Sequence, residues 1–556
     1  TVTGSESIGG LVGESSGAVN NASASGTVTA TDQYAGGLIG DHQSTTPVTD
    51  VNASGAVTGT SYIGGLLGRG QADVINASAG GSVNGTSGGY VGGLIGQYNP
   101  SQAATIANVS ASGDVSASGN RVGGLVGQAS SSSNNQITVS DAHASGAVNA
   151  TNTGKYAYTG GLIGEFQNAG NVTDVSAIGD VNASSTPGNG RRVGGLFGEL
   201  HHDSANYILT NASATGDVNA TGQRVGGLIG NLKGGRSVEA SYAKGDVSTT
   251  GDTAGGLIGR SAEVPITDSY ARGDVNSSGG NVGGLVGYTT ADITNASASG
   301  DVTSTSGSHV GGLIGQWRLN ADDGLFGSSS SALAGHQMVS ATASGNVSAD
   351  NKYIGGLVGR VSSGFDCARF FGDFGIGCRS GTLVRGYAPI SDAHATGDVN
   401  TTYDEGENAY VGGLIGRMDG ARQITNLSAS GEVTSASGDR VGGLIGNVNH
   451  ADGNYGITNA SATGNVSTTG QRVGGLIGYH QNGDRVETSY ARGDVSTDGD
   501  YVGGLIGDTN DGSITDSYAR GDVNSSGDYV GGLVGEASGD VTRAYASGRV
   551  EGDGTD

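Results

Sequence analysis

Hydrophobic residues recur along this chain in one short block, separated by glycine and polar residues. The block x-Gly-Gly-Leu-x-Gly occurs seventeen times, from Ile8–Gly13 to Val530–Gly535, most often at intervals of 28 residues. Its first position is Val, Ile or Ala in every copy except one, which has Thr159. Because so short a unit cannot enclose a core of its own, this periodicity predicts repeats that stack and bury one another's apolar side chains.

The stacked elements are predicted to be strands. Runs such as Tyr501–Ile506 are short, rich in β-branched residues and bounded by glycine, and the 110 glycines of the chain disfavour helices. We predict an all-β fold, a single elongated β-solenoid (β-helix) of about 17 coils that runs continuously over residues 1–556. Each coil should contain two or three strands, with the leucine and the first residue of each block forming apolar ladders inside.

The repeated block resembles the GLUG motif, a glycine-leucine-any-glycine repeat of bacterial and archaeal surface proteins, adhesins and some immunoglobulin A peptidases. The resemblance covers nearly the whole chain. It implies an extracellular β-helical module, usually a stalk or an adhesive region, and it brings no catalytic residues with it. The sequence also lacks a His-Glu-x-x-His zinc motif. We therefore expect that the chain is not an enzyme and requires no cofactor.

The charge of the chain limits the classes of partner that it can bind. The formal net charge is −25, and the four lysines are Lys155, Lys233, Lys244 and Lys352. So acidic a chain is a poor partner for nucleic acid. Acidic, lysine-poor surfaces stay hydrated at high salt, where screening suppresses their self-repulsion. We favour a halophilic source, with an ordinary acidic secreted protein as the alternative.

The location is predicted to be extracellular or on the cell surface. No apolar run approaches the length that spans a membrane, and no signal peptide precedes Thr1. We expect a processed chain, or one cut from a longer protein, with no membrane-spanning segment here. Expected partners are cell-surface or extracellular-matrix components, or copies of the chain itself.

Asn-x-Ser/Thr sequons recur throughout the repeats, and each is a potential glycan acceptor in a secreted protein. A chain rich in Asn, Ser and Thr also forms such triplets by composition alone. Because adjacent coils are only about 4.8 Å apart, glycans on every coil would collide, so we expect some sites to be occupied and not all. The candidates are Asn21, Asn52, Asn76, Asn108, Asn211, Asn295, Asn426 and Asn459.

Two longer intervals, of 44 and 57 residues, interrupt the repetition. They predict inserted loops at residues 316–337 and 360–389, which should emerge side by side as a lateral knob. Aromatic side chains away from the core favour a binding surface, and the alternative is a small core in which the loops bury each other's rings. The candidate contact residues are Trp317, Phe326, Phe365, Phe370, Phe371 and Phe374.

The two cysteines, Cys367 and Cys378, lie close together in the second predicted loop. A disulfide between them would staple a segment that the stacked strands cannot hold. Two free thiols are the alternative.

Aspartates in the recurrent Gly-Asp-Val element should stack from coil to coil. Like charges directly opposed on neighbouring strands are destabilising, so bound Ca²⁺ or other cations, or high salt, would relieve them. The nonapeptide calcium-binding repeat of other β-rolls is absent, and solvated side chains are the alternative. The candidate positions are Asp180, Asp217, Asp246, Asp274 and Asp301.

Two further short patterns could each indicate a binding function, and for each the repeated sequence offers an alternative explanation. Arg-Gly-Asp at 272–274, 492–494 and 520–522 suggests receptor binding, but the general Gly-Asp-Val element explains these triplets better. Polar triplets such as Thr29–Thr31 and Thr58–Thr60 suggest an ice-binding threonine array, although other polar residues interrupt it.

Together these patterns predict a structural and adhesive protein: an extracellular rod or stalk of a cell surface, glycosylated and adapted to salt. Residues 210–216 return as residues 458–464, which indicates lengthening by duplication. The leading alternative is the subunit of an extracellular filament that stacks end to end, since an open solenoid end presents an unpaired strand edge. Ice binding is the lesser alternative.

Overall fold

The computed structural model describes every residue except 88, 133–135, 153, 155, 186–189, 203–206, 320–335, 363–387, 404–408, 450–455, 482–484 and 553–556. All regular elements among the described residues are β-strands, which confirms the all-β class. The chain forms two compact units. Unit 1 comprises Thr1–Gly280 and Gly284–Gly287, and unit 2 comprises Asn281–Gly283 and Tyr288–Asp556.

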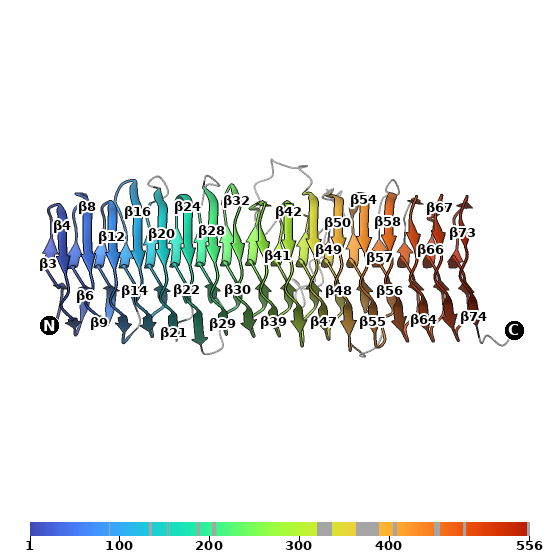
Figure 1. The fold of residues 1–556 in the computed structure, drawn as a ribbon, viewed down its shortest axis with the longest axis horizontal. Helices are drawn as coiled ribbons and strands as arrows, with labels where there is room; N and C mark the ends of the chain where they lie inside the picture. The colour runs from blue at the N-terminus through green and yellow to red at the C-terminus, as the bar shows by residue number, and fades with distance from the viewer. Residues whose placement is uncertain are drawn as a thin grey trace, which may run out of the picture. The chain divides into compact units, whose positions relative to one another are not determined.

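Each unit is a parallel β-solenoid whose complete coils pass through four sheets, here named D, A, B and C in chain order (Figure 1). One coil of unit 1 consists of β8 (Val48–Ala53), β9 (Val57–Gly59), β10 (Ser61–Gly64) and β11 (Leu67–Gly70). The same sheets of unit 2 contain β54 (Ala421–Ala429), β55 (Val433–Ser435), β56 (Arg440–Gly442) and β57 (Ile445–Asn449).

The predicted solenoid is confirmed, with two corrections. A coil has four strands rather than two or three, because the repeated block itself bends and so contributes to both sheet B and sheet C. The described coils make about 15 turns, slightly fewer than the predicted number of about 17. No helix in the described part is long and apolar enough to cross a membrane.

Successive coils pair in register, so equivalent residues stack on one another. In sheet D, for example, Val74 pairs with Val48 and Ala79 pairs with Ala53. Sheet A shows the simplest pattern, in which a buried valine is followed by an exposed polar residue and a buried small residue, as in β13 (Val83–Gly85). The interior therefore consists of ladders of one residue type, and the surface of ladders of another.

The three glycines of each block leave no room for a side chain. A Cβ on Gly64 would lie 2.0 Å from the Leu67 carbonyl oxygen, and one on Gly65 would lie 2.1 Å from the Gly93 oxygen. A Cβ on Gly68 would lie 2.4 Å from the Gly40 oxygen of the preceding coil. These approaches allow the sharp bend between sheets B and C.

The bend directs both apolar residues after the paired glycines into the core. The block leucines form a fully buried ladder in each unit, and so do the residues at the first block position, including Thr159. The predicted interior ladders are thereby confirmed, except in the end coils, where Leu11 is 52% exposed and Ile8, Val530 and Leu533 are half-buried. Burying one leucine contributes about 1.5–3 kcal/mol, so the ladders dominate the stability of each unit. Buried examples are Leu38, Leu66, Leu94, Leu414, Leu444 and Leu476.

The predicted boundaries of the two insertions were wrong at their ends. Residues 316–318 belong to β45 (Ile314–Arg318), and residues 360–362 belong to β49 (Val358–Ser362), because sheet C continues for five residues in both coils. Sheet D resumes with β46 (Met338–Ala343) and β50 (Ala388–Ala395). Most of each insertion, and hence the predicted lateral knob, lies outside the described residues.

We expect Gly65→Ala to destabilise unit 1 by about 1–3 kcal/mol or more, because the added methyl group must displace the backbone of the next coil. Gly280→Ala is the matched control, since its nearest backbone oxygen, that of Asp252, lies 3.5 Å from the added Cβ. Its effect should stay within about 0.5 kcal/mol. Urea unfolding followed by circular dichroism measures both. Equal losses would contradict the steric explanation.

Candidate binding surface

The side chains directly before and after each block meet at the bend between sheets B and C. Because the last glycine of the block packs against the sheet B backbone, the two flanking residues lie across the bend from each other. We call these side chains the flank row. In unit 1 it begins with a stack of Tyr34, Tyr62 and Tyr90, whose ring centroids are 4.8 and 4.9 Å apart. Arg69 covers Tyr34 and forms a bidentate ion pair with Asp41, at 2.8 and 2.6 Å.

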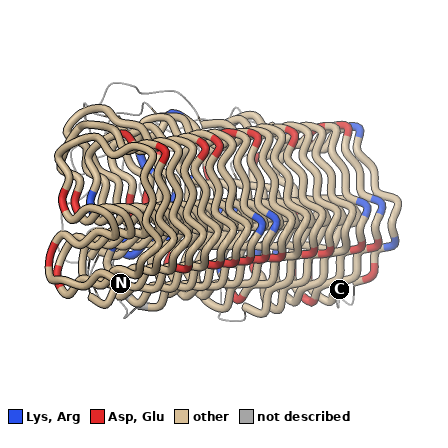
Figure 2. Tube along the Cα trace, turned by 60° about the vertical axis from the view of Figure 1, so that its left-hand side comes forward, with Lys and Arg blue, Asp and Glu red and all other residues tan. Residues whose placement is uncertain are grey.

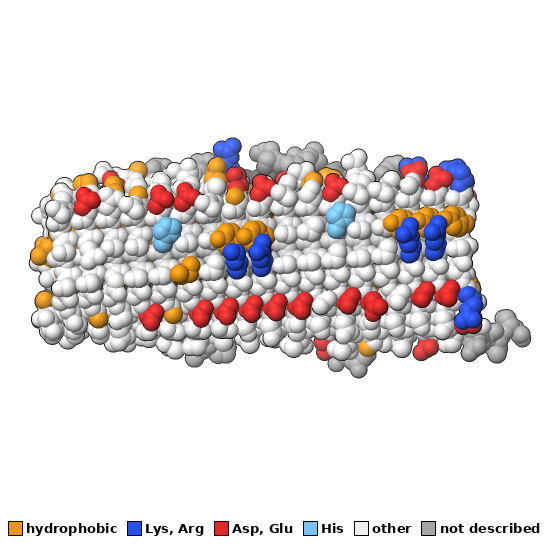
Figure 3. Space-filling view, in the orientation of Figure 1, with side chains coloured by type: hydrophobic (Ala, Val, Ile, Leu, Met, Phe, Trp, Pro, Cys, Tyr) orange, Lys and Arg blue, Asp and Glu red, His pale blue; other side chains and the backbone are white. Residues whose placement is uncertain are grey.

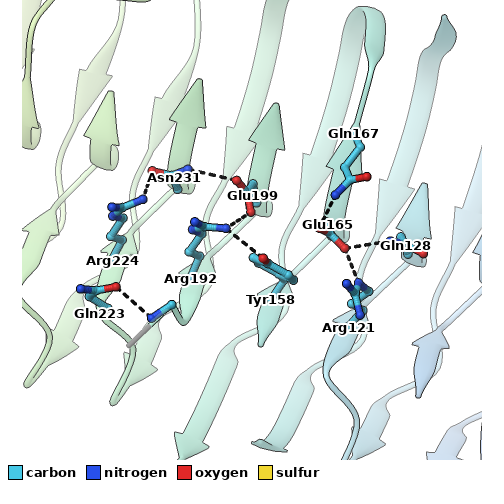
Figure 4. Close-up of polar contacts among 11 residues, drawn as sticks. Arg121, Gln128, Tyr158, Glu165, Gln167, Arg192, Glu199, Gln223, Arg224 and Asn231 are labelled. Atoms are coloured by element: carbon cyan, nitrogen blue, oxygen red, sulfur yellow. Dashed lines mark hydrogen bonds and ion pairs between the residues drawn. The ribbon is translucent and has the colours of Figure 1, made fainter. Parts of the chain in front are cut away.

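Further along unit 1, the flank row joins arginines to buried carboxylates (Figure 4). Arg192 contacts Glu199 and donates a hydrogen bond to the Tyr158 hydroxyl at 3.0 Å. Asn231 donates to Glu199 at 3.2 Å and accepts a hydrogen bond from Arg224 at 2.8 Å. The groups are therefore linked by a chain of contacts and hydrogen bonds that crosses successive coils.

A second carboxylate in the same view has an equally complete set of partners. Arg121 contacts Glu165, which is 1% exposed. Gln128 and Gln167 donate hydrogen bonds to the two oxygens of Glu165 at 2.9 and 2.6 Å. A buried carboxylate is tolerated only with such partners, so we interpret this part of the row as structural.

Burial changes the titration of the flank row. Desolvation raises the pKa of Glu199, against the opposing effect of Arg192. Desolvation and the charge of Glu199 raise the pKa of Tyr158 to about 12, so its hydroxyl stays neutral. In unit 2, burial likewise raises the pKa of Asp508.

Unit 2 repeats the arrangement with different residues. Arg472 donates to Asp508 at 3.0 Å and lies 3.6 Å from Asp439. Asp439 also pairs with Arg440 at 2.9 Å. Both guanidinium groups lie over the Tyr479 ring, at 5.1 and 5.3 Å from its centroid. The flank row thus fills the bend in both units with aromatic and ion-paired side chains.

A different set of aromatic and basic residues is exposed on sheet D. In unit 1, the Tyr242 and Tyr270 rings stack with centroids 5.0 Å apart and planes 4° apart. Lys244 lies 4.7 Å from the Tyr242 centroid, and Arg272 lies 4.8 Å from the Tyr270 centroid. We call these four residues the unit 1 plate. Figure 3 shows such paired aromatic and basic side chains on the surface.

The unit 2 plate has the same construction over three coils. Tyr490, Tyr518 and Tyr545 stack with both centroid distances at 5.1 Å. Arg492 lies over Tyr490 at 4.7 Å and donates to the Tyr518 hydroxyl at 3.2 Å. Arg520 lies over Tyr518 at 4.9 Å and donates to the Tyr545 hydroxyl at 3.2 Å.

The plates explain the Arg-Gly-Asp triplets as parts of the coil. In the triplet at 272–274, the arginine packs on Tyr270. A Cβ on Gly273 would lie 2.0 Å from the Gly245 oxygen, so glycine is required there. The backbone N–H of Asp274 donates to Asp246 at 2.8 Å. Each residue of the triplet therefore has a structural role, and receptor binding stays a prediction.

The predicted aspartate stack exists in unit 1 and has its own hydrogen bonds. The backbone N–H of each aspartate donates to the carboxylate of the preceding coil: Asp217 to Asp180 at 2.9 Å, Asp246 to Asp217 at 2.9 Å, and Asp274 to Asp246 at 2.8 Å. We call this the aspartate ladder, and acidic rows of this kind are visible along successive coils (Figures 2 and 3). These N–H groups offset the repulsion that we expected cations to relieve.

In unit 2 the same ladder includes amides. Asp301 accepts the N–H of Asn346 at 2.7 Å, and Asn346 accepts the N–H of Asp398 at 2.9 Å. An amide oxygen can therefore replace the carboxylate in this role. Within the described residues, no three His, Cys, Asp or Glu side chains lie close enough together to hold a metal ion.

The repeat is identified by its family as well as by its geometry. The sequence profile of the GLUG motif matches residues 278–303 and 469–496. The glycines and leucine of that motif are the residues that form the bend in the coils described above. These two segments of the β-solenoid are GLUG repeats.

One curated relative is similar to part of the GLUG solenoid. Over 157 residues the chain is 73% identical to halomucin of Haloquadratum walsbyi (strain DSM 16790 / HBSQ001). The matched segment is 28% of this chain and 2% of halomucin, so the chain spans only a small fraction of that relative. No solved structure matches the chain.

Seven of the eight sequon candidates share one unusual backbone position in sheet D of the GLUG solenoid. There the pairing between neighbouring coils skips one residue on each strand, and the asparagine adopts a left-handed conformation, which Asn tolerates better than most residues. Asn108 donates from Nδ2 to Asn76 at 2.7 Å, and Asn76 donates to Asp50 at 2.9 Å, so the nitrogen that would carry a glycan already has a partner. Glycan occupancy stays a prediction. The residues are Asn21, Asn76, Asn108, Asn211, Asn295, Asn426 and Asn459.

The eighth candidate, Asn52 in β8, is exposed and donates to Ser78 at 2.7 Å.

The predicted threonine array is short: Thr3 pairs with Thr29 and Thr29 with Thr58, after which Asn84 takes the position. Ice binding therefore stays a prediction without support from a longer array.

Trp317 was wrongly assigned to a contact surface. It lies in β45, is fully buried, and donates from its indole N–H to the Ala291 carbonyl oxygen at 2.9 Å. Its sequence neighbours suggested a loop because the insertion follows directly. The other contact candidates and the predicted disulfide lie outside the described residues: Phe326, Phe365, Phe370, Phe371, Phe374, Cys367 and Cys378.

Sequence reasoning missed the flank row and the plates. The signal was present in both cases. Tyr or Arg precedes many blocks while a charged or amide residue follows them, and Ser-Tyr-Ala-Arg/Lys recurs in sheet D. Only the register between coils shows that these residues stack.

For the aspartate ladder, we expect Asp217→Ala to cost about 1 kcal/mol, because it leaves the Asp246 N–H without its acceptor. Asp217→Asn keeps an acceptor, as Asn346 does naturally, and should change stability by less than about 0.5 kcal/mol. Relative to the wild type, the Asn variant should gain stability as salt is lowered, since it removes one repelling charge. Urea unfolding at low and high salt measures these differences, and equal effects of Ala and Asn would contradict the ladder.

For the flank row, we expect a pH effect with a defined sign at Glu199. Because burial raises its pKa, the folded state holds this proton more tightly than the unfolded state. As pH rises above the ordinary glutamate value of about 4.3, the wild type should lose stability relative to Glu199→Gln. The loss should level off once pH exceeds the folded-state pKa. Unfolding free energies of both proteins across this range test it, and a difference that is constant or of opposite sign would refute it.

Proposed function

We propose that this chain is part of an extracellular, cell-surface protein, in which stacked GLUG coils provide a non-catalytic structural and adhesive scaffold. The observation that carries the proposal is the construction of every described coil from the same bend, ladder and flank row. A surface of repeated ladders is suited to spacing and contact along its length rather than to one reaction centre. The similarity to halomucin over a quarter of the chain supports the same class of protein.

Salt adaptation and glycosylation belong to this proposal. The net charge of −25 favours a setting in which salt screens the surface. The exposed asparagines of sheet D supply acceptors for glycans, and neighbouring coils limit how many can be occupied together.

End-to-end assembly is the second candidate. Apolar side chains are exposed in the first and last described coils, including Leu11 at 52% and Val541 at 45%. Another copy, or further coils of a longer chain, would cover them. Electron microscopy of the purified protein separates the two candidates, because filaments whose length grows with concentration require contacts between copies.

We expect antibodies against this chain to label intact, unpermeabilised cells of the source organism, and brief protease treatment of those cells to remove the label. Immunogold electron microscopy makes the measurement, with an antibody against a cytoplasmic protein as the control. Labelling that appears only after permeabilisation would overturn the extracellular proposal.

A further inference from the structure

The two plates are unusual cationic features on an acidic surface. Lys244, Arg272, Arg492 and Arg520 are all exposed. Among the described residues, no carboxylate lies within ion-pair distance of these four groups; they contact tyrosine rings and, in unit 2, tyrosine hydroxyls. Two other exposed arginines in or next to strands of sheet D are paired, Arg485 with Glu487 and Arg543 with Asp516. The plates therefore keep positive charge available in a chain of net charge −25.

The tyrosine stack fixes where these charges lie. Arg492 and Arg520 each rest on a tyrosine of their own coil and donate to the hydroxyl of the next tyrosine. Ordering a long basic side chain normally costs about 0.5–1.5 kcal/mol on binding, and here much of that ordering precedes the partner. The plates are thus prepared to receive an anion.

The spacing indicates a linear partner. The rings of successive coils are 5.0 Å apart in unit 1 and 5.1 Å apart in unit 2, and each plate presents one cation per coil in two successive coils. A polymer that follows the stacking direction would match this array if it carried one negative charge per monomer at a similar repeat. A pyranose chain has such a repeat, whereas the phosphates of one strand of duplex DNA advance by only about 3.4 Å each along the helix axis.

The neighbouring residues distinguish a polysaccharide from a simple polyanion. A residue of the aspartate ladder lies two positions after each plate cation in the sequence. These residues are Asp246 and Asp274 in unit 1 and Asp494 and Asp522 in unit 2. In unit 1, the N–H of Asp274 occupies one oxygen of Asp246. In unit 2, Asp522 does the same to Asp494. Sugar hydroxyls can donate hydrogen bonds to the aspartate ladder while acidic substituents contact the plate. A partner with dense negative charge and few hydroxyls would be repelled by the carboxylates of the ladder.

We propose that the two plates bind a linear acidic polysaccharide with about one carboxylate or sulfate per sugar, aligned along the stack of coils. The arginines and the lysine bind the acidic groups of the polysaccharide, and the aspartate ladder accepts hydrogen bonds from its hydroxyls. The inference rests on the proposed extracellular role, and it names the partner through which the scaffold adheres.

The test uses the full chain and polymers of defined chemistry. Alginate supplies carboxylates, dextran sulfate supplies sulfates, neutral dextran is the uncharged reference, and single-stranded DNA represents another class of polyanion. Biolayer interferometry on immobilised polymers measures the affinities at one fixed salt concentration. We expect binding to alginate or dextran sulfate, with the stronger of the two identifying the acidic group, and none to neutral dextran.

Variants then locate the binding. The double variant Arg492→Gln/Arg520→Gln should weaken binding about tenfold, and adding Lys244→Gln/Arg272→Gln should abolish it. The matched control is Arg485→Gln/Arg543→Gln, which makes the same charge change in unit 2 at exposed arginines that already have carboxylate partners. It should weaken binding by less than about threefold.

Several results would overturn the inference. These are no binding to either acidic polymer, equal losses in the plate and control variants, and binding of DNA as strong as that of the polysaccharides. Tyr518→Phe adds a check that does not depend on charge, because it removes the hydroxyl that positions Arg492 while leaving the ring, and it should weaken binding. If the plates do not bind the acidic polymers, the result of the cell-labelling experiment is unaffected. The proposed polysaccharide binding and the proposed extracellular location can therefore fail independently.

Discussion

The structure depends on the approach of backbone to backbone at the three glycines of each block. At Gly64, Gly65 and Gly68 a single added carbon would overlap a carbonyl oxygen. This approach creates the bend between sheets B and C, and the bend in turn directs the following leucine inward. It also brings the residues before and after the block together, so the flank row is a consequence of the same constraint.

Stacking in register creates a second demand, because a polar residue that is repeated in the sequence meets its own copy one coil away. The solenoid meets this demand differently at each position. The aspartate ladder uses the N–H of the next coil, and the plates stack aromatic rings beneath their cations. The flank row surrounds buried carboxylates with arginine and amide donors, as at Glu165. Repetition is therefore compatible with a strongly acidic chain.

These devices also explain how one fold can combine a uniform scaffold with local function. In most ladders, the polar groups form their hydrogen bonds within the stack of coils. The plates differ, because their cations rest on tyrosine and remain open to a partner. Specific contact can thus be added to a repeated structure by changing residues at one exposed position in a few coils.

Periodicity alone determined the class of fold, the stacked coils, the leucine ladder and the aspartate stack, since a repeated residue in parallel register must meet its own copies. The number of strands per coil depended on where the block bends, and that depends on carbonyl oxygens of neighbouring coils that no pattern of side chains reveals. For the same reason Trp317, which stands at the edge of an insertion in sequence, proved to be a core residue. Which charges are neutralised was likewise decided by tertiary structure: Arg492 and Arg543 are both exposed arginines, but only the register of the coils places Asp516 beside Arg543 and the Tyr518 hydroxyl beside Arg492.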